Sequence, residues 1–373
     1  MSKSKSSGGS VFRHDLFTVD FSKVDKYTGV RAATILVPII VLGFITRHDT
    51  ALAIMAAGFV LAIDEMRPPG PRTLLLLLVS VIYTAFFALG MIISMVDYLV
   101  VPLLALGVFF IVYLRVFPKA FSVLFFAGIF FILELTTHNA TLTRTGVESL
   151  QILIGGLWVI PAGAIFPSHK YLKRQTADQS VHERQQQSRA KLTRQDSFKL
   201  FTSNLSIHSQ YFQNALALAI TIVIGLLIAQ WLKLKEPAWL LITIWAVLVP
   251  AFPDISLAFR VGRRIIGTFI GAIIAIVIIH YIDNQVLLAV LLVVAIGIYV
   301  SVINTRNYAF TLIFMTVVIL LLRDIPDPSR NLILPITRFE NIVIGSLLSL
   351  LTAFIIWIVP KIGKGAKLEK SKQ

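Results

Sequence analysis

The chain contains no cysteine among its 373 residues. Disulfide bonds, thiolate nucleophiles and cysteine-ligated metal sites are therefore excluded. Charged residues are also scarce, at 14% of the sequence, whereas a soluble domain carries about 25%. Hydrophobic residues make up 57%. A chain of this composition needs lipid rather than water around most of its surface.

Several motifs that carry chemistry are missing as well. The sequence has no Gly-x-x-x-x-Gly-Lys-Ser/Thr loop for nucleotide phosphates and no His-Glu-x-x-His pattern for zinc. Residues 1–30 are polar and lack an apolar stretch followed by a small-residue cleavage site, so we expect no cleaved signal peptide. The sequence thus predicts a protein that is not an enzyme and that needs no cofactor and no metal.

Long apolar runs are abundant, and about 20 apolar residues suffice to cross a bilayer as a helix. They predict an all-α membrane protein with about twelve transmembrane helices. The expected spans are 31–46, 49–65, 73–95, 97–115, 119–137, 147–166, 212–232, 237–253, 264–282, 285–303, 307–323 and 335–359.

Lysine and arginine are distributed unevenly between the loops. With the N-terminus inside, 27 of the 34 basic residues fall on the cytoplasmic side. Because basic loops stay in the cytoplasm, both termini and the central linker are expected there, in the inner (plasma) membrane. The net charge of +15 is then a topology signal and an attraction to anionic lipid, and we expect no nucleic-acid partner.

The order of spans predicts two similar halves. The segments GVESLQILIG at 146–155 and ITRFENIVIG at 336–345 resemble each other, and each lies at the start of the sixth span of its half. Two halves that both begin inside form parallel repeats, with a transport path expected between them. The resulting division is 1–30 as a cytoplasmic segment, 31–166 as the first repeat, 167–211 as a basic cytoplasmic linker, 212–359 as the second repeat and 360–373 as a basic tail.

Three segments of the second half resemble the fusaric-acid-resistance (FUSC) superfamily, which includes aromatic acid exporters and is related to aluminium-activated malate transporters. They are WLLITIWAVLVP at 239–250, RVGRRIIGTFIG at 260–271 and NYAFTLIFMT at 307–316. The resemblance extends over 205–358 and is only topological over 27–166. It implies export of aromatic or related organic acids. The chain departs from larger exporters of the family, which carry sizeable cytoplasmic domains.

Arginine is the leading candidate for binding an anion, because its planar donors match a carboxylate. Arg260, Arg263 and Arg264 share one face of a helix, and they are equally interpreted as anchors to lipid phosphate. Aromatic residues near them offer stacking surfaces. The substrate candidates are Arg260, Arg263, Arg264, Trp245, Tyr308 and Arg338.

Acidic residues near the ends of spans are the candidates for carrying protons. Asp64 and Glu65 adjoin each other, and adjacent carboxylates repel, although both are also interpreted as solvated acids neutralised by Arg67 and Arg72. The complete set of proton-coupling candidates is Asp64, Glu65, Glu134, Asp254 and Glu340. Gly267 and Gly271 form a small-xxx-small pair that favours close helix packing.

Together these features favour a secondary transporter that exports small, aromatic or hydrophobic organic acids and is driven by the proton gradient. A passive anion channel and a non-transporting scaffold of an envelope assembly are the alternatives. The expected partners are the organic anion and the lipid bilayer. A periplasmic adaptor protein and a second copy of the chain are left open as further partners.

Overall fold

The computed structural model describes residues 22, 24–46, 49–66, 72–135, 141–167, 199, 201–207, 209–251, 257–303, 307–324 and 333–370. Its long apolar segments all form helices, because a backbone surrounded by lipid must satisfy its hydrogen bonds internally. The first half contains α2 (Lys26–Thr46), α3 (Ala51–Met66), α4 (Arg72–Ser94), α5 (Asp97–Tyr113), α6 (Pro118–Leu135) and α7 (Leu142–Ile165). The second half contains α11 (Gln210–Trp231), α12 (Ala238–Ala251), α13 (Leu257–Tyr281), α14 (Gln285–Val302), α15 (Tyr308–Asp324) and α16 (Ile333–Lys370).

The chain is an all-α, multi-pass membrane protein. In the described residues, eight helices are long and apolar enough to cross a membrane, and α3, α6, α12 and α15 are shorter apolar helices. Their outward surfaces carry exposed leucine, isoleucine and valine, as expected for contact with lipid. The twelve-span count stays a prediction with respect to the four shorter helices.

Several helix ends differ from the expected spans. The basic segment with Arg260 and Arg264 lies inside α13, which begins at Leu257 rather than at 264. Helix α16 continues to Lys370, so the residues expected as a separate tail extend the last helix. Both differences have one cause: polar and basic residues are good helix formers, whereas the expected spans counted only apolar ones.

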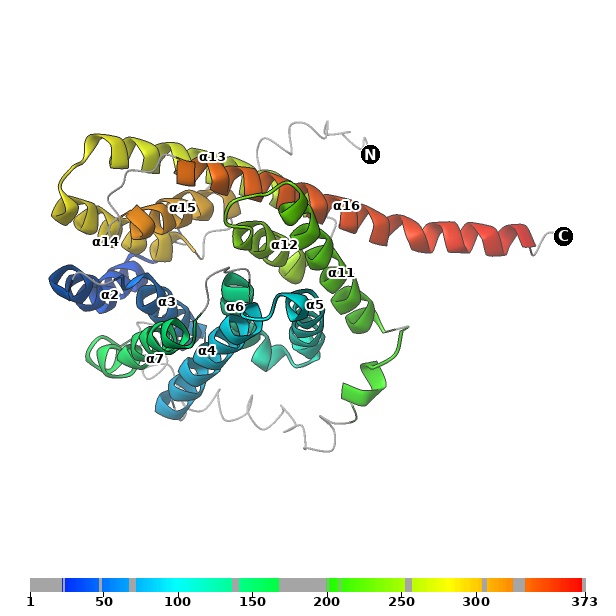
Figure 1. The fold of residues 1–373 in the computed structure, drawn as a ribbon, viewed down its shortest axis with the longest axis horizontal. Coiled ribbons are helices and arrows are strands. Elements are labelled where there is room, and N and C mark those ends of the chain that lie inside the picture. The colour runs from blue at the N-terminus through cyan, green and yellow to red at the C-terminus, as the bar shows by residue number, and fades with distance from the viewer. Residues whose placement is uncertain are drawn as a thin grey trace, which may run out of the picture.

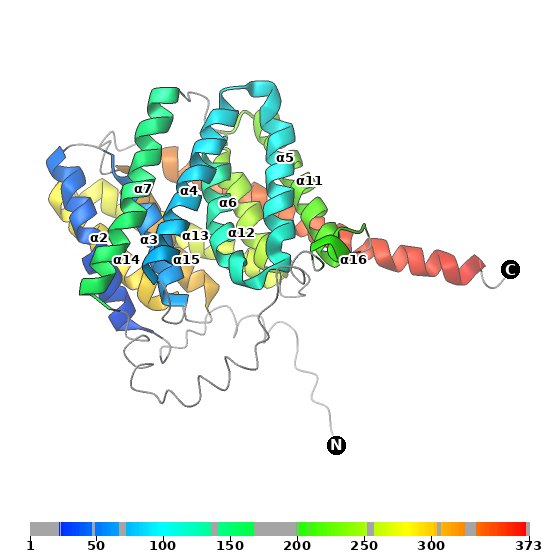
Figure 2. The ribbon, with the colours of Figure 1, turned by 90° about the horizontal axis from the view of Figure 1, so that it is seen from below.

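The two halves contain the same helix contacts. In each half the third helix packs against the fifth and the sixth, and the second packs against the sixth. Figure 1 shows the first six helices in the lower part of the view, with the second six above and to the right of them. In Figure 2 helices α4, α5, α6 and α7 run roughly side by side.

Two atomic contacts recur at matched places. The side-chain amide of Gln151 on α7 donates to the carbonyl oxygen of Asp49 at 2.9 Å, and that of Asn341 on α16 donates to the carbonyl oxygen of Lys235 at 2.8 Å. Gly155 lies against the backbone of Ala53, as Gly345 lies against the backbone of Leu240. The second and sixth helices therefore meet in the same way in both halves.

The halves also exchange contacts through their first and fourth helices. Helix α2 packs on α14, and α11 packs on α5. At the first of these contacts Gly29 lies against Ser301 and the carbonyl oxygen of Gly297, a position with no room for a side chain. Each half thus supplies a partner for the first helix of the other.

Candidate functional site

Arg264 lies on the buried face of α13 and is only 5% exposed. Its Nη1 donates to the hydroxyl oxygen of Tyr308 at 2.9 Å, and its Nη2 donates to the hydroxyl oxygen of Thr243 at 3.3 Å. Its Nε is buried and has no hydrogen-bond partner. The guanidinium of Arg260 lies 5.7 Å from the centre of the same Tyr308 ring. Two of the three predicted arginines therefore meet at Tyr308.

Arg338 occupies the first turns of α16 and is also 5% exposed. Its guanidinium carbon lies 3.9 Å from the centre of the Trp239 ring, a cation–π contact. Its Nε and Nη1 are buried and have no hydrogen-bond partner in the described part of the chain. The contact with Trp239 orients the guanidinium while leaving these donors available.

Glu236 lies next to Trp239 and contacts both this tryptophan and Arg323. Its carboxylate accepts a hydrogen bond from Nε1 of Trp239 at 2.9 Å and forms an ion pair with Arg323. Its backbone has a φ of 52°, a left-handed conformation that is uncommon outside glycine. The carboxylate is thus committed to Arg323 and Trp239 and does not form an ion pair with Arg338.

The two buried arginines have no acidic partner in the described part of the chain. Ion pairs there join Arg31 and Arg72 to Asp64, Arg144 to Glu148 and Arg323 to Glu236. Asp254, one of the proton-coupling candidates, lies outside the described residues. A guanidinium inside a membrane bundle costs about 2.5–3.5 kcal/mol on insertion scales, so an uncompensated pair requires a counter-charge from elsewhere.

A polar stripe continues from Arg338 along α16. Asn341 is fully buried and its side-chain oxygen has no hydrogen-bond partner, and the same holds for the hydroxyl of Ser346. Further along, Ser349 bonds to the carbonyl of Gly345, and Thr352 bonds to Thr221 of α11 at 2.8 Å. Residues 338, 341, 345, 349 and 352 share one face of a helix, so this stripe runs along a single side of α16, and Ser346 lies about 100° around the helix from Gly345.

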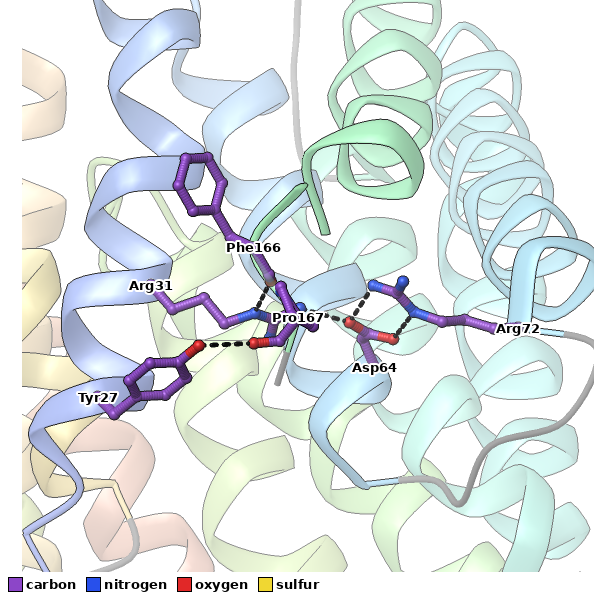
Figure 3. A network of polar contacts seen from close by, with 6 residues as sticks. All are labelled: Tyr27, Arg31, Asp64, Arg72, Phe166 and Pro167. Atoms are coloured by element: carbon purple, nitrogen blue, oxygen red, sulfur yellow. Dashed lines mark hydrogen bonds and ion pairs between the residues drawn. The ribbon is translucent and has the colours of Figure 1, made fainter. Parts of the chain in front are cut away.

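The corresponding charges of the first half are neutralised. Asp64 accepts hydrogen bonds from Arg72 at 2.6 and 2.7 Å and from Nη2 of Arg31 at 2.8 Å. Figure 3 shows the two arginines reaching this carboxylate from opposite sides. Arg31 also donates to the carbonyl oxygen of Phe166 at 2.6 Å, and Tyr27 donates to that of Pro167 at 2.9 Å. This network ties α2, α3 and α4 to the end of α7.

The expectation that Asp64 is a solvated acid is wrong for this side chain, which is 6% exposed. Two guanidiniums surround it, which favours its charged form and suits it to a structural role. Sequence reasoning placed Arg72 beside it but missed Arg31, which is 33 positions away. The basic residue at the start of α2, inside an otherwise apolar helix, was the available signal.

The remaining candidates are dispersed. Trp245 is fully buried where α12 meets α6, with its Nε1 donating to the carbonyl oxygen of Phe125 at 3.2 Å, so it faces away from Thr243 and Arg264. Glu134 is buried in α6 within electrostatic range of Arg144.

Glu340 is exposed and Arg263 is half-buried. The side chain of Glu65 lies outside the described residues.

Gly267 and Gly271 face α15. A Cβ at either position would lie 2.5 Å from a backbone oxygen, of Ala309 or of Ile313 respectively. These contacts bring α13 and α15 close together and hold Arg264 beside Tyr308. Sequence reasoning missed Thr243, Asn341 and Ser346, because an uncharged polar residue in an apolar helix is common and carries little signal by itself.

Comparison with known proteins finds a family that is similar to most of the second half. Residues 219–352 match the model of the fusaric acid resistance protein-like family, which confirms the resemblance found in the sequence. The uncharacterized protein slr1298 of Synechocystis sp. is 28% identical over 153 residues, which are 41% of this chain and 20% of that protein. The chain thus matches about a fifth of the length of this relative. No solved structure matches. The relation to aluminium-activated malate transporters stays a prediction.

Proposed function

We propose that this chain, a member of the fusaric acid resistance protein-like family through its second half, exports small organic acids across the inner membrane as their anions. Its many apolar helices and its family support a role in membrane transport. The proposed orientation has both termini in the cytoplasm. The proposed chemistry of the exported molecule follows from the buried arginines of the second half.

The observation that carries the proposal is the pair of buried arginines, Arg264 and Arg338, with no carboxylate in ion-pair contact among the described residues. Buried charges are normally paired, because desolvation of an isolated ion is costly. A carboxylate that arrives with the substrate supplies the missing counter-charge. It also accepts hydrogen bonds from guanidinium donors that are otherwise unmet.

Aromatic rings beside both arginines favour acids that carry a flat or apolar body. Trp239 contacts Arg338, and Tyr308 contacts Arg260 and Arg264. Rings next to a guanidinium bind apolar surface while the charge is neutralised. Benzoate and hydroxybenzoates have this combination of one carboxylate and one ring.

Proton coupling is part of the proposal, and Glu134 is the described carboxylate best suited to it. It is 5% exposed near the end of α6 and lies within electrostatic range of Arg144. An ionisable residue at such depth is typical of proton relays. Asp64 forms ion pairs with two arginines, and Glu340 is exposed. Both are therefore less suited than Glu134 to carrying a proton.

The test is efflux of 4-hydroxybenzoate from loaded proteoliposomes, with and without an imposed proton gradient. We expect Arg264→Gln and Arg338→Gln each to reduce efflux by about tenfold or more, because a hydrogen bond to a charged group contributes roughly 1.5–3 kcal/mol. Lys26→Gln is the control, since Lys26 is exposed and lies at the start of α2 in the first half. Equal efflux from all three variants would contradict the proposal.

A passive anion channel is the second candidate, because two buried arginines without an ion-pair partner among the described residues also suit ion conduction. Planar-bilayer recording separates the two. Unitary anion currents that do not depend on a proton gradient would identify the channel, whereas gradient-dependent efflux without such currents identifies the coupled exporter. Stable co-purification with an envelope partner, combined with no anion movement in either assay, would identify the scaffold.

A further inference from the structure

Besides three in the first half, on Tyr83, Glu148 and Ser149, five buried polar atoms without a hydrogen-bond partner among the described residues lie on two helices of the second half. They are Nε of Arg264, Nε and Nη1 of Arg338, the side-chain oxygen of Asn341 and the hydroxyl of Ser346. All belong to α13 and α16, two helices that pack against each other. Each unmet polar group in a dry bundle costs several kcal/mol, so this region has to be met by water or by a ligand.

These groups are ordered along α12. Arg338 lies over Trp239 in its first turn, and Arg264 reaches Thr243, four residues further along the same helix. Four residues correspond to about 6 Å along a helix axis. The two guanidinium groups therefore lie about one turn apart in depth. The α16 stripe from residue 338 to residue 352 extends this line over about 21 Å of a hydrocarbon core of about 30 Å.

The first half has the same helix contacts, but an acidic residue occupies the position that corresponds to Arg338. In the alignment of 146–155 with 336–345, the position of Arg338 is occupied by Glu148, which forms an ion pair with Arg144 at 2.7 Å. Arg31 and Arg72 are bound to Asp64. A carboxylate substrate would therefore meet an acidic residue and committed arginines in this half, where binding is unfavourable.

The described contacts between the halves are largely apolar. Trp245 packs against Phe125 with ring centres 6.1 Å apart, and Gly29 packs against Ser301 across α2 and α14. Phe109 packs against Phe212 with ring centres 5.2 Å apart, where α5 meets α11. The sequence predicted a path between the halves, but these aromatic and small side chains offer no charge to an anion that crosses there. The described charge at this interface is Arg115, whose Nη1 donates to the carbonyl oxygen of Val249 at 2.7 Å and whose guanidinium lies over Phe121.

We infer that the second half alone holds two successive carboxylate-binding stations, Arg338 over the Trp239 ring and Arg264 beside the Tyr308 hydroxyl, and that the anion crosses the membrane along the seam of α12, α13 and α16. The first half is the scaffold that holds this seam in place. The inference rests on the proposed transport of organic anions and assigns its route. The ligand is a small monocarboxylate. Its carboxylate binds first to one guanidinium and then to the next.

The natural chain has no cysteine, so a single introduced cysteine reports its own environment without background. Three Ser→Cys variants test the three routes. Ser346→Cys lies on the buried side of α16 in the second half, Ser80→Cys lies where α4 meets α7 in the first, and Ser301→Cys lies between the halves at α2 and α14. Each full-length variant is reconstituted in liposomes and treated with the anionic reagent methanethiosulfonate ethylsulfonate, and modification is followed by mass.

We expect Ser346→Cys to be modified about tenfold or more faster than the two others, since a dry packed site reacts only after local opening. Added benzoate should slow that reaction. In the Ser346→Cys background, Arg338→Gln should slow the anionic reagent while leaving the neutral methyl methanethiosulfonate unaffected. This comparison separates loss of the charge from misfolding, because a misfolded variant reacts faster with both reagents.

Faster modification of Ser80→Cys or Ser301→Cys, with protection by benzoate, would overturn the inferred route even if the protein exports anions. An unreactive Ser346→Cys would overturn it as well. Conversely, benzoate could protect Ser346→Cys from modification although no efflux is measured. That result would support the two carboxylate-binding stations and refute the proposed export. The two readouts therefore fail separately.

Discussion

The guanidinium of Arg338 lies 3.9 Å from the centre of the Trp239 ring, and that ring donates its N–H to Glu236. One aromatic side chain thus separates a buried cation from its nearest acid. It orients the arginine without neutralising it.

Replacement of Trp239 by leucine should weaken substrate binding. A cation–π contact that is shielded from water is worth about 2 kcal/mol, so we expect KM for the exported acid to rise by about tenfold or more while the protein stays folded. Efflux kinetics in proteoliposomes measure this. Trp245→Phe is the control: it loses the bond to the carbonyl of Phe125 and should change melting temperature more than KM.

Glu236→Gln should have the opposite effect on binding. The carboxylate of Glu236 interacts electrostatically with Arg338 although it forms an ion pair with Arg323. Its removal raises the positive potential at Arg338, so the acid should bind several-fold more tightly and leave more slowly. Arg323→Gln keeps Glu236 charged and should weaken binding. The same direction of change in both variants would contradict this electrostatic account.

Asp64→Asn should destabilise the protein strongly. It removes the carboxylate that Arg31, whose side chain is 2% exposed, contacts at 2.8 Å, and removal of one member of a buried ion pair costs about 3–5 kcal/mol. Thermal unfolding in detergent measures the loss. Glu148→Gln breaks an ion pair with the 40% exposed Arg144 and should cost less than about 1 kcal/mol. Recovery of stability in the double variant Arg31→Gln/Asp64→Asn would identify the unpaired charge as the cause.

Gly267→Ala and Gly262→Ala form a matched pair on α13. A Cβ at Gly267 lies 2.5 Å from the carbonyl oxygen of Ala309, whereas no atom lies within 4 Å of one at Gly262. We expect the first variant to lose about 1–3 kcal/mol through overpacking and to separate Arg264 from Tyr308. The second should gain up to about 1 kcal/mol, because alanine favours a helix more than glycine does. Melting temperatures of the two variants should move in opposite directions.

The positions of the helices could be predicted from the sequence because lipid allows so few alternatives. Long apolar runs define the spans, and matching segments such as 146–155 and 336–345 predict a repeat. The repeat stays a prediction, which the matched bonds of Gln151 and Asn341 support.

The identity of charge partners could not be predicted in the same way. Whether an arginine is neutralised depends on which side chain meets it across the bundle, as Asp64 meets Arg31 and nothing acidic among the described residues meets Arg338. Both arginines look alike in sequence, since each lies at the polar end of an apolar run. Helix packing that joins distant positions decides between a structural role and a binding role.

The exchange of first helices between the halves makes them interdependent. Since α2 packs mainly on α14 and α11 packs mainly on α5, each half covers much of the other's first helix. A gene cut between the codons for α7 and α11 should therefore yield two fragments that are degraded when expressed singly and that assemble when expressed together. If such fragments complement each other, variants of one half can be selected genetically while the other half is kept unchanged.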